Sequence, residues 1–366
     1  MSYRSGKMGV AECLAMVFIM TFSSIFLTTP ARTLVNQATL GWVSVLLNGL
    51  TAAAMLWVIY YLLGDHDSDL LQVTEFYLGK TGVWLAGLYY CILFWTEAVS
   101  LLRQYTENTL LTALPQTEFT LVLLTYGLTI VCIAYVGLEP VCRATYLIMP
   151  FALGGLLLVL AALLPYYNVY SLFPLQGNGW KEFFGKGMLT GGINVACVAP
   201  ALLAGTFHDR RTWFSGSLLG ISLSISFKAL GVLAFTLIFG VAVGQERILP
   251  FYELSRLVYL GRFLQRIESL FIMLWVISGI LAITLHLYMG LYLFTRLFEL
   301  PSLRPLLPIS AVLIATVAAI PTDVAAVLQV EAIVIRTLAN GGLCGVPLLL
   351  LLLSLWKGRP KAGQSG

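Results

Sequence analysis

Residues 8–30 read MGVAECLAMVFIMTFSSIFLTTP, an apolar run long enough to cross a bilayer as one helix. Two features interrupt it: hydroxyl groups gather at Thr21-Phe22-Ser23-Ser24, and the run stops at Thr28-Thr29-Pro30. Polar groups at mid-depth are unfavourable against lipid, so the stretch predicts a first span that is broken part-way and faces other helices. A cleaved leader would have a shorter apolar stretch before a small-residue cleavage site, so we interpret this segment as a retained span.

The composition of the whole chain is that of an integral membrane protein. Of 366 residues, 59% are hydrophobic and only 10% are charged. Soluble domains carry roughly a quarter charged residues because their surface faces water. A soluble enzyme and a disordered tail protein are therefore excluded. The formal net charge of +4 is small and the basic residues are scattered singly, which also excludes a nucleic-acid partner.

Ten apolar runs of about spanning length follow one another along the chain. They lie near residues 9–29, 38–63, 82–112, 119–136, 144–165, 187–204, 213–243, 266–297, 306–321 and 335–356. We therefore expect one all-α transmembrane domain over residues 1–366, surrounded by the lipid bilayer, with a short polar tail at 357–366. An even number of spans places both termini on one side. The loops on that side hold more Lys and Arg than the opposite loops, which predicts cytoplasmic termini.

One loop segment, near residues 250–265, is amphipathic. Its apolar residues recur at three- and four-residue intervals opposite charged ones, which predicts a helix beginning at Pro250. Such a helix lies along the membrane interface or packs on the protein as an ordinary loop helix. Both interpretations remain open from the sequence.

Ten spans are compatible with two five-helix halves related by inversion, as in many secondary transporters. Repeat one would cover about 9–165 and repeat two about 187–356, so the first and sixth spans would correspond. The sixth run is also interrupted, by Thr190-Gly191-Gly192-Ile193-Asn194. Unwound helix ends expose N–H and C=O groups that suit the carboxylate and ammonium of an amino acid. The alternative is that the small residues only permit close helix packing.

Ionisable residues inside the predicted spans need a partner or a water path. Lys228 lies near the middle of the seventh run, where its amine would take the place of a coupling cation or give up its proton. Glu97 lies in the third run, six residues before Arg103, so the two face different directions and do not pair. Lys228 and Glu97 are the candidates for coupling or proton transfer.

Polar and aromatic stripes on two other spans are candidates for a pocket wall. Thr284 and Tyr288 are four residues apart on the eighth run and share a face, as do Phe94 and Ala98 on the third. These stripes would line a pocket or a water path. Ordinary interhelical hydrogen bonding and core packing explain them nearly as well.

The chain shows no pattern of catalytic or metal-binding residues. His66 lies among Asp65, Asp67 and Asp69 in a loop, and His208 adjoins Asp209, but neither cluster has an HExxH spacing. The six cysteines form no CxxC pair. We expect neither an enzyme nor a cofactor nor a metal site.

Two motifs carry a resemblance to a known family. They are Pro250-Phe-Tyr-Glu-Leu-Ser-Arg, continued by Gly261-Arg-Phe-Leu-Gln-Arg-Ile-Glu-Ser-Leu-Phe-Ile, and Gly137-Leu-Glu-Pro-Val-Cys-Arg. The sequence resembles the GerAB-type spore germination permeases over essentially its whole length. These are the B subunits of nutrient germinant receptors and belong to the amino acid-polyamine-organocation superfamily.

The resemblance implies a five-plus-five inverted repeat with broken helices 1 and 6 in the spore inner membrane. It also implies a small nutrient ligand, typically an amino acid, and partner A and C subunits. The resemblance assigns the ligand-binding pocket to Ser23, Ser24, Phe94, Ala98, Asn194, Val195, Thr284 and Tyr288. The glycines of the sixth-span break, Gly191 and Gly192, complete the candidate ligand-binding residues. Lys228 departs from the usual apolar seventh span of the family. Two other functions remain open: an autonomous proton- or cation-coupled amino acid permease, and an ion or water channel opened by a partner subunit.

Overall fold

The computed structural model describes residues 7–64, 68–184, 195–258, 267–321, 329–330 and 336–357. Within these ranges the regular structure is helical, and the one β-bridge joins Met8 to Phe207. Among the described residues, seven helical segments are long and apolar enough to cross a membrane, and two shorter apolar ones are Val10–Phe26 and Leu306–Ala319. The predicted all-α membrane protein is confirmed. The count of ten spans and the division into two repeats remain predictions.

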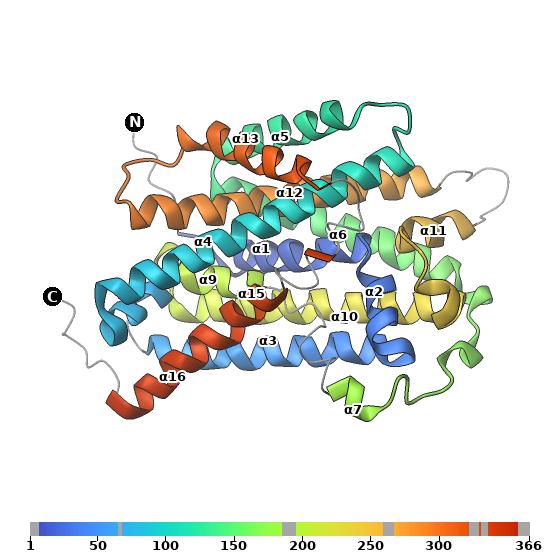
Figure 1. The fold of residues 1–366 in the computed structure, drawn as a ribbon, viewed down its shortest axis with the longest axis horizontal. Helices are drawn as coiled ribbons and strands as arrows, with labels where there is room; N and C mark the ends of the chain where they lie inside the picture. The colour runs from blue at the N-terminus through green and yellow to red at the C-terminus, as the bar shows by residue number, and fades with distance from the viewer. Residues whose placement is uncertain are drawn as a thin grey trace.

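The helices of the first half begin with an interrupted one and continue as long rods (Figure 1). They are α1 (Val10–Phe22), η1 (Ser23–Phe26), α2 (Thr29–Gln37), η2 (Ala38–Leu40), α3 (Gly41–Leu63), α4 (Leu70–Thr112), α5 (Phe119–Val136), α6 (Leu138–Ala162), η3 (Leu164–Tyr166) and η4 (Val169–Leu172). The first and last helices, α1 and α16, have their outer ends toward the same end of the bundle (Figure 1). This agrees with termini on one side. Which side of the membrane that is remains a prediction.

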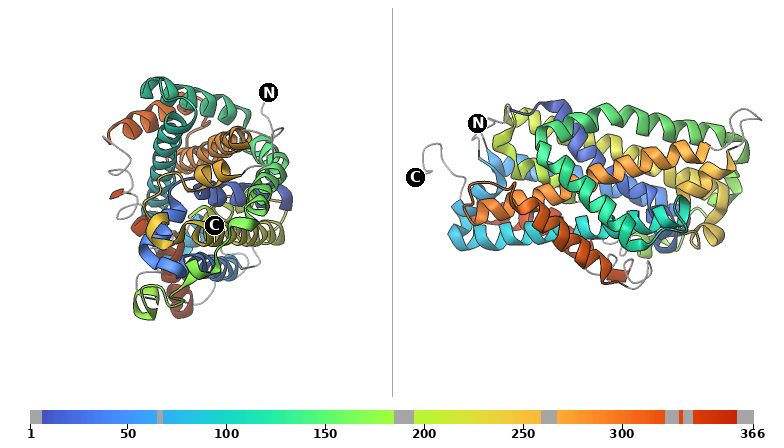
Figure 2. Two further views of the ribbon diagram at one scale, coloured as in Figure 1. Left: turned by 90° about the vertical axis from the view of Figure 1, so that its right-hand side faces the viewer. Right: turned by 90° about the horizontal axis from the view of Figure 1, so that it is seen from above.

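The second half contains short pieces around a few long rods. They are α7 (Trp180–Glu182), η6 (Val195–Val198), α9 (Ala199–Leu202), η7 (Ala204–Thr206), α10 (Arg210–Gly244), α11 (Pro250–Leu257), α12 (Ile267–Leu297), α13 (Leu306–Ala319), α15 (Arg336–Asn340), η9 (Gly341–Gly345) and α16 (Val346–Lys357). The long helices lie side by side in a bundle that is clearly longer than it is wide (Figure 2).

The predicted break in the first span is confirmed. Helix α1 ends at Phe22, a tight 3-10 turn follows at Ser23–Phe26, and Leu27 is extended before α2 begins at Thr29. Pro30 lies in the first turn of α2, where its missing N–H costs nothing. The predicted break residues of the sixth span, 190–194, lie outside the described residues. From Val195 onward that span consists of short helical pieces only.

Helices α1 and α10 pack against each other at the centre of the bundle (Figure 1). Two glycines of α10 make this approach close. A Cβ atom at Gly216 would lie 2.6 Å from the Cβ of Cys13, and one at Gly220 would lie 2.8 Å from the carbonyl oxygen of Leu14. Small residues at such contacts let helix backbones approach in a membrane. Close packing against α10 therefore fixes the position of α1.

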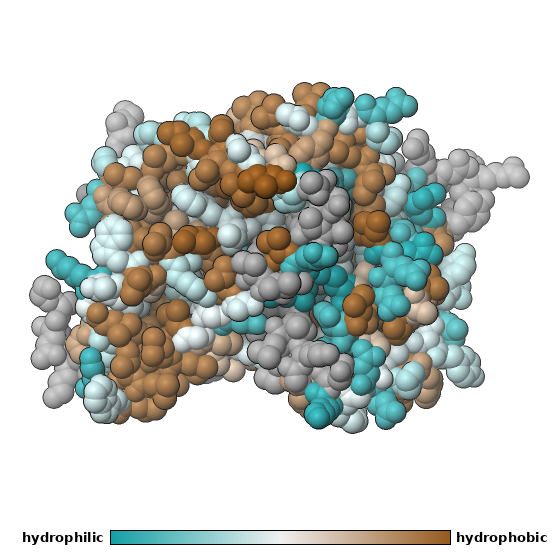
Figure 3. Space-filling view, in the orientation of Figure 1, coloured by the Kyte–Doolittle hydropathy of each residue, from teal (hydrophilic) through white to brown (hydrophobic). Residues whose placement is uncertain are grey.

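The outer surface is strongly apolar. Large side chains such as Leu85, Leu128 and Leu147 are exposed on the rods. Figure 3 shows apolar residues covering much of one face, with most of the hydrophilic residues on its right half. In water, such a surface would drive aggregation, whereas lipid tails solvate it without penalty. This apolar outer surface is therefore that of a multi-pass membrane protein surrounded by lipid.

The amphipathic segment packs on the protein. Helix α11 covers Pro250–Leu257, and its residues Phe251 and Leu254 are fully buried. It contacts α10, α12 and η1. Of the two interpretations left open by the sequence, the described part of the segment fits the loop helix packed on the bundle.

The α1–α10 contact predicts that Gly220→Ala lowers thermal stability. The added methyl group meets backbone of α1, so the helices must move apart, and overpacking of this kind costs about 1–3 kcal/mol. Gly154→Ala on α6 is the matched control, because a Cβ there meets nothing within 4 Å. The control should be neutral or slightly stabilising, since alanine is the better helix former. Thermal unfolding of the detergent-purified variants measures both. Equal melting temperatures for the two variants would contradict the close contact.

Candidate ligand site at the interrupted first helix

The break in the first helix is held by side chains from two other helices. The end of α1 leaves backbone carbonyls without helical partners. The Nζ of Lys228, on α10, donates to the carbonyl oxygen of Thr21 at 3.1 Å and to the Oγ of Ser24 at 2.9 Å. From α4, the Oη of Tyr105 donates to the carbonyl oxygen of Ser23 at 2.9 Å. Polar groups thus replace the hydrogen bonds that the helix gives up.

Lys228 reaches this position from the middle of a long span. Its side chain is buried, with 5% exposure, and its amine contacts the carbonyl oxygen of Thr21 in the interior of the bundle. A lysine that snorkels would instead carry its amine to the membrane surface. The prediction that Lys228 lies inside the protein is confirmed, whereas its part in coupling or proton transfer remains a prediction.

Tyr105 depends on a close fit to α12. Its ring is fully buried and lies 5.6 Å from the ring of Trp275 between centroids. A Cβ atom on Gly279 would lie 2.1 Å from the ring of Tyr105, so only glycine leaves room for it. Tyr105 and Trp275 were not predicted as site residues. The sequence contained a signal, because Ser278-Gly279 interrupts an otherwise bulky apolar helix.

Aromatic rings close the break on the side of α11. The ring centroid of Phe26 lies 6.3 Å from that of Phe251 and 5.4 Å from that of Phe271. A Cβ at Gly231 would lie 2.5 Å from Phe251 and 2.8 Å from Ile25, so α10 also meets this cluster closely. Phe251 belongs to the motif at residues 250–256. That motif therefore covers the turn after α1.

The structure brings several of the predicted site residues into the interior. Phe94, Ala98, Val195 and Thr284 are buried, and Ser24 and Glu97 are half-buried. The ring of Phe94 lies 6.2 Å from the imidazole of His286 between centroids. Gly191, Gly192 and Asn194 lie outside the described residues. Whether these residues contact a ligand remains a prediction.

Tyr288 lies at a different depth from the break. It lines a cavity of about 480 Å³ with Met8, Leu138, Thr206 and Arg304, beside the start of α1. The break instead lies beside Gly279, which contacts Tyr105. Gly279 precedes Tyr288 by nine residues on α12, which corresponds to about 14 Å along the helix at 1.5 Å per residue. Thr284 lies between these two levels. The Thr284 and Tyr288 face thus runs from the interior toward one end of the bundle.

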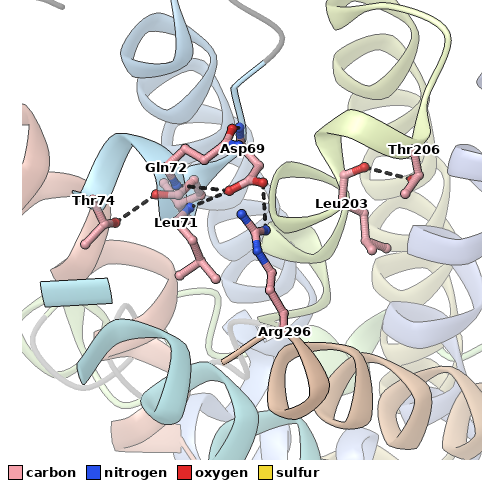
Figure 4. A network of polar contacts seen from close by, with 8 residues as sticks. Asp69, Leu71, Gln72, Thr74, Leu203, Thr206 and Arg296 are labelled. Atoms are coloured by element: carbon pink, nitrogen blue, oxygen red, sulfur yellow. Dashed lines mark hydrogen bonds and ion pairs between the residues drawn. The ribbon is translucent and has the colours of Figure 1, made fainter. Parts of the chain in front are cut away.

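Ion pairs tie the helices together at that end. Asp69 caps α4 by accepting from the N–H groups of Leu71 and Gln72, and its Oδ2 lies 2.6 Å from the Nη1 of Arg296 on α12 (Figure 4). Arg143 pairs with Glu139 at 2.7 Å and with Glu12 of α1 at 3.2 Å. The motif at residues 137–143 therefore connects α6 to the first helix.

The buried arginine of the third span serves the structure. Arg103 pairs with Glu107 one turn later, donates to the carbonyl oxygen of Ala318 at 3.2 Å and stacks on the ring of Phe119 at 4.3 Å. These contacts join α4 to α13 and α5. These contacts agree with the prediction that Arg103 and Glu97 face different directions. We therefore assign Arg103 a structural role and do not include it in the ligand site.

The fold and the interrupted helix define a class of protein: multi-pass membrane proteins with a transporter-like fold. The fold is similar to that of Mhp1, a nucleobase-cation-symport-1 family transporter solved in a closed conformation with bromovinylhydantoin bound. The TM-score is 0.68 at 13% identity, over 98% of this chain and 95% of that one. A mutant of the manganese transporter of Eremococcus coleocola matches with a TM-score of 0.60 at 12% identity, over 95% of this chain and 77% of that one.

The family profile described as "Spore germination protein" matches residues 7–326. The chain belongs to this spore germination permease family, as its two motifs indicated. A comparison with curated proteins found no match.

The contact between Tyr105 and Ser23 predicts that Tyr105→Phe destabilises the protein. The change removes one hydroxyl and leaves a buried carbonyl oxygen without that donor, which costs about 1–3 kcal/mol. Tyr166→Phe is the control, because Tyr166 is exposed outside the spans. The melting temperature should fall for Tyr105→Phe and stay unchanged for the control. If both variants melt like the wild type, Tyr105 does not hold the break.

Proposed function

We propose that this chain is the ligand-binding B subunit of a nutrient germinant receptor. It binds a small nutrient, an amino acid, beside the interrupted first helix, and it signals to A and C subunits in the spore inner membrane. The observation that carries the proposal is the break at 23–28, which is enclosed by α4, α10, α11 and α12. Irregular backbone at membrane depth is tolerated where it is buried in protein or lines a cavity. Family membership supports the germination role.

Two buried polar atoms support a ligand in this interior. The Oγ of Ser23 and the Nε2 of His286 are buried, and neither has a hydrogen-bond partner within the described residues. An unsatisfied buried polar group costs about 1–3 kcal/mol, so it is normally retained for a ligand, an ordered water or a reaction. Ser23 is one of the residues that the family resemblance assigned to the pocket.

The chemistry of the break favours a zwitterion. The first turn of α2 presents N–H groups, and Thr28, its N-cap residue, makes no capping hydrogen bond with its side chain. Such a helix start favours a carboxylate, whereas the carbonyl oxygens of the break that do not already accept from Lys228 or Tyr105 favour an ammonium group. An amino acid carries both charges on one small molecule. We therefore propose an amino acid over a sugar.

An autonomous permease is the second candidate, and the fold similarity to transporters favours it. The cavity at Tyr288 would then be one end of the transport path. Receptor and permease share the pocket and differ in flux. Binding without movement of the solute supports the receptor, and movement without partner subunits supports the permease.

Replacing Gly192 with Val is expected to weaken nutrient binding by about tenfold or more, because a β-branched residue opposes an unwound backbone. Gly154→Val on α6 is the control, because a Cβ there meets nothing within 4 Å. Isothermal titration with single amino acids on the purified protein measures affinity, after a germination panel has identified the nutrient. An unchanged affinity in Gly192→Val would remove the sixth span from the proposed site.

Liposomes that contain this chain alone distinguish the two candidates. We expect the labelled nutrient to bind the protein without accumulating inside the vesicles, because a receptor shifts between states instead of transporting. Vesicles with Gly192→Val protein provide the background. Uptake above that background would establish the permease and contradict a purely signalling subunit.

A further inference from the structure

Two hydroxyl groups at the α1–α10 contact differ from the others on the long helices. In most helical Ser and Thr residues here, the hydroxyl donates to a carbonyl one turn earlier, as in Thr236 to Val232 at 2.7 Å and Ser217 to Trp213 at 2.7 Å. The Oγ1 of Thr21 and the Oγ of Ser224 are buried and have no hydrogen-bond partner in the part of the chain that the structure describes. Buried hydroxyls that give up this local bond need another partner.

The packing register places these two hydroxyls at one level. Gly220 meets Val17 of α1, and Lys228 meets Thr21 and Ser24, so the helices run in the same direction. Ser224 lies one turn after Gly220 and one turn before Lys228. Because it is buried on the same face of α10 as these two residues, it faces α1 near the level of Thr21.

The oxygens at this level form a set that suits a hard monovalent cation. They are the carbonyl oxygen and the Oγ1 of Thr21, the Oγ of Ser24 and the Oγ of Ser224. Carbonyl and hydroxyl oxygens prefer such cations over softer metals. The carbonyl end of α1 adds the negative pole of its helix dipole. In secondary transporters, the carbonyl ends of broken helices are where coupling cations bind.

We propose that the ammonium of Lys228 is a tethered cation in a monovalent-cation site at the end of α1. The amine already takes two of the oxygens, at 3.1 Å and 2.9 Å. Because the amine is covalently attached, two of the four oxygens always have a cation beside them, and the broken helix is held to α10 without a dissolved ion. Removing the side chain opens the site to Na⁺ or NH₄⁺. This inference concerns the cation requirement, so it stands apart from the identity of the nutrient.

The test compares Lys228→Ala with Lys228→Met. Alanine leaves space at the oxygens, whereas methionine fills most of the same volume without charge. Both variants are purified in detergent, and melting temperatures are measured in sodium, ammonium and N-methyl-D-glucamine chloride at one ionic strength. Both should melt below the wild type. Sodium or ammonium, but not the bulky organic cation, should raise the melting temperature of Lys228→Ala by about 3 °C or more, as expected for a ligand that binds only the folded state.

Three controls make the outcome decisive. Lys228→Met should gain nothing from sodium or ammonium, and Ser224→Ala added to Lys228→Ala should reduce the gain. The wild type should melt at one temperature in all three salts. Equal melting temperatures of Lys228→Ala in the three salts, or a sodium-dependent wild type, would overturn the proposal. If the alanine variant is not monodisperse, Lys228→Thr, which keeps more volume, is measured against the same criteria.

Discussion

A helix that stops in the middle of a membrane leaves backbone carbonyl groups that lipid cannot satisfy, and each costs several kcal/mol. At the end of α1 the protein supplies donors from outside the helix: the amine of Lys228 and the hydroxyl of Tyr105. Tyr105 lies in the part of α4 after its kink at Gly79, and Lys228 lies in the part of α10 before its kink at Gly240, so the irregular segment is fastened to regular stretches of helix. The rest of the interior is arranged so that these two side chains can reach the break.

Both the smallest residue, glycine, and the bulky residue phenylalanine contribute to that arrangement. Glycines at 216, 220 and 279 remove side chains where α1 meets α10 and where Tyr105 meets α12. Phenylalanines at 26, 251 and 271 fill the space on the other side of the turn. The break is thus fixed by α4 and α10 and covered by α11. A nutrient that binds there, as we propose, would change contacts on several helices at once, and its occupancy would then shift the conformation of the bundle.

The sequence predicted what depends on the local pattern. Hydroxyls at 21–24 before Pro30 marked the broken first helix, and a lysine distant from either end of its run marked a buried amine. It did not reveal what depends on contacts between helices. Tyr105 reads as an ordinary aromatic residue until Gly279 is placed against it, and the four-residue spacing of Thr284 and Tyr288 shows a shared face without showing depth. The segment near 250–265 left lipid and protein packing equally open, because amphipathicity identifies an apolar face without identifying what covers it.

The central claim is tested most directly by a cryo-electron microscopy map of the purified protein in a lipid nanodisc. The account predicts that the backbone leaves the helical path between Ser23 and Thr28, and that side-chain density of Lys228 reaches the carbonyl oxygen of Thr21. A continuous helix from Val10 to Gln37, with Lys228 directed elsewhere, would contradict it.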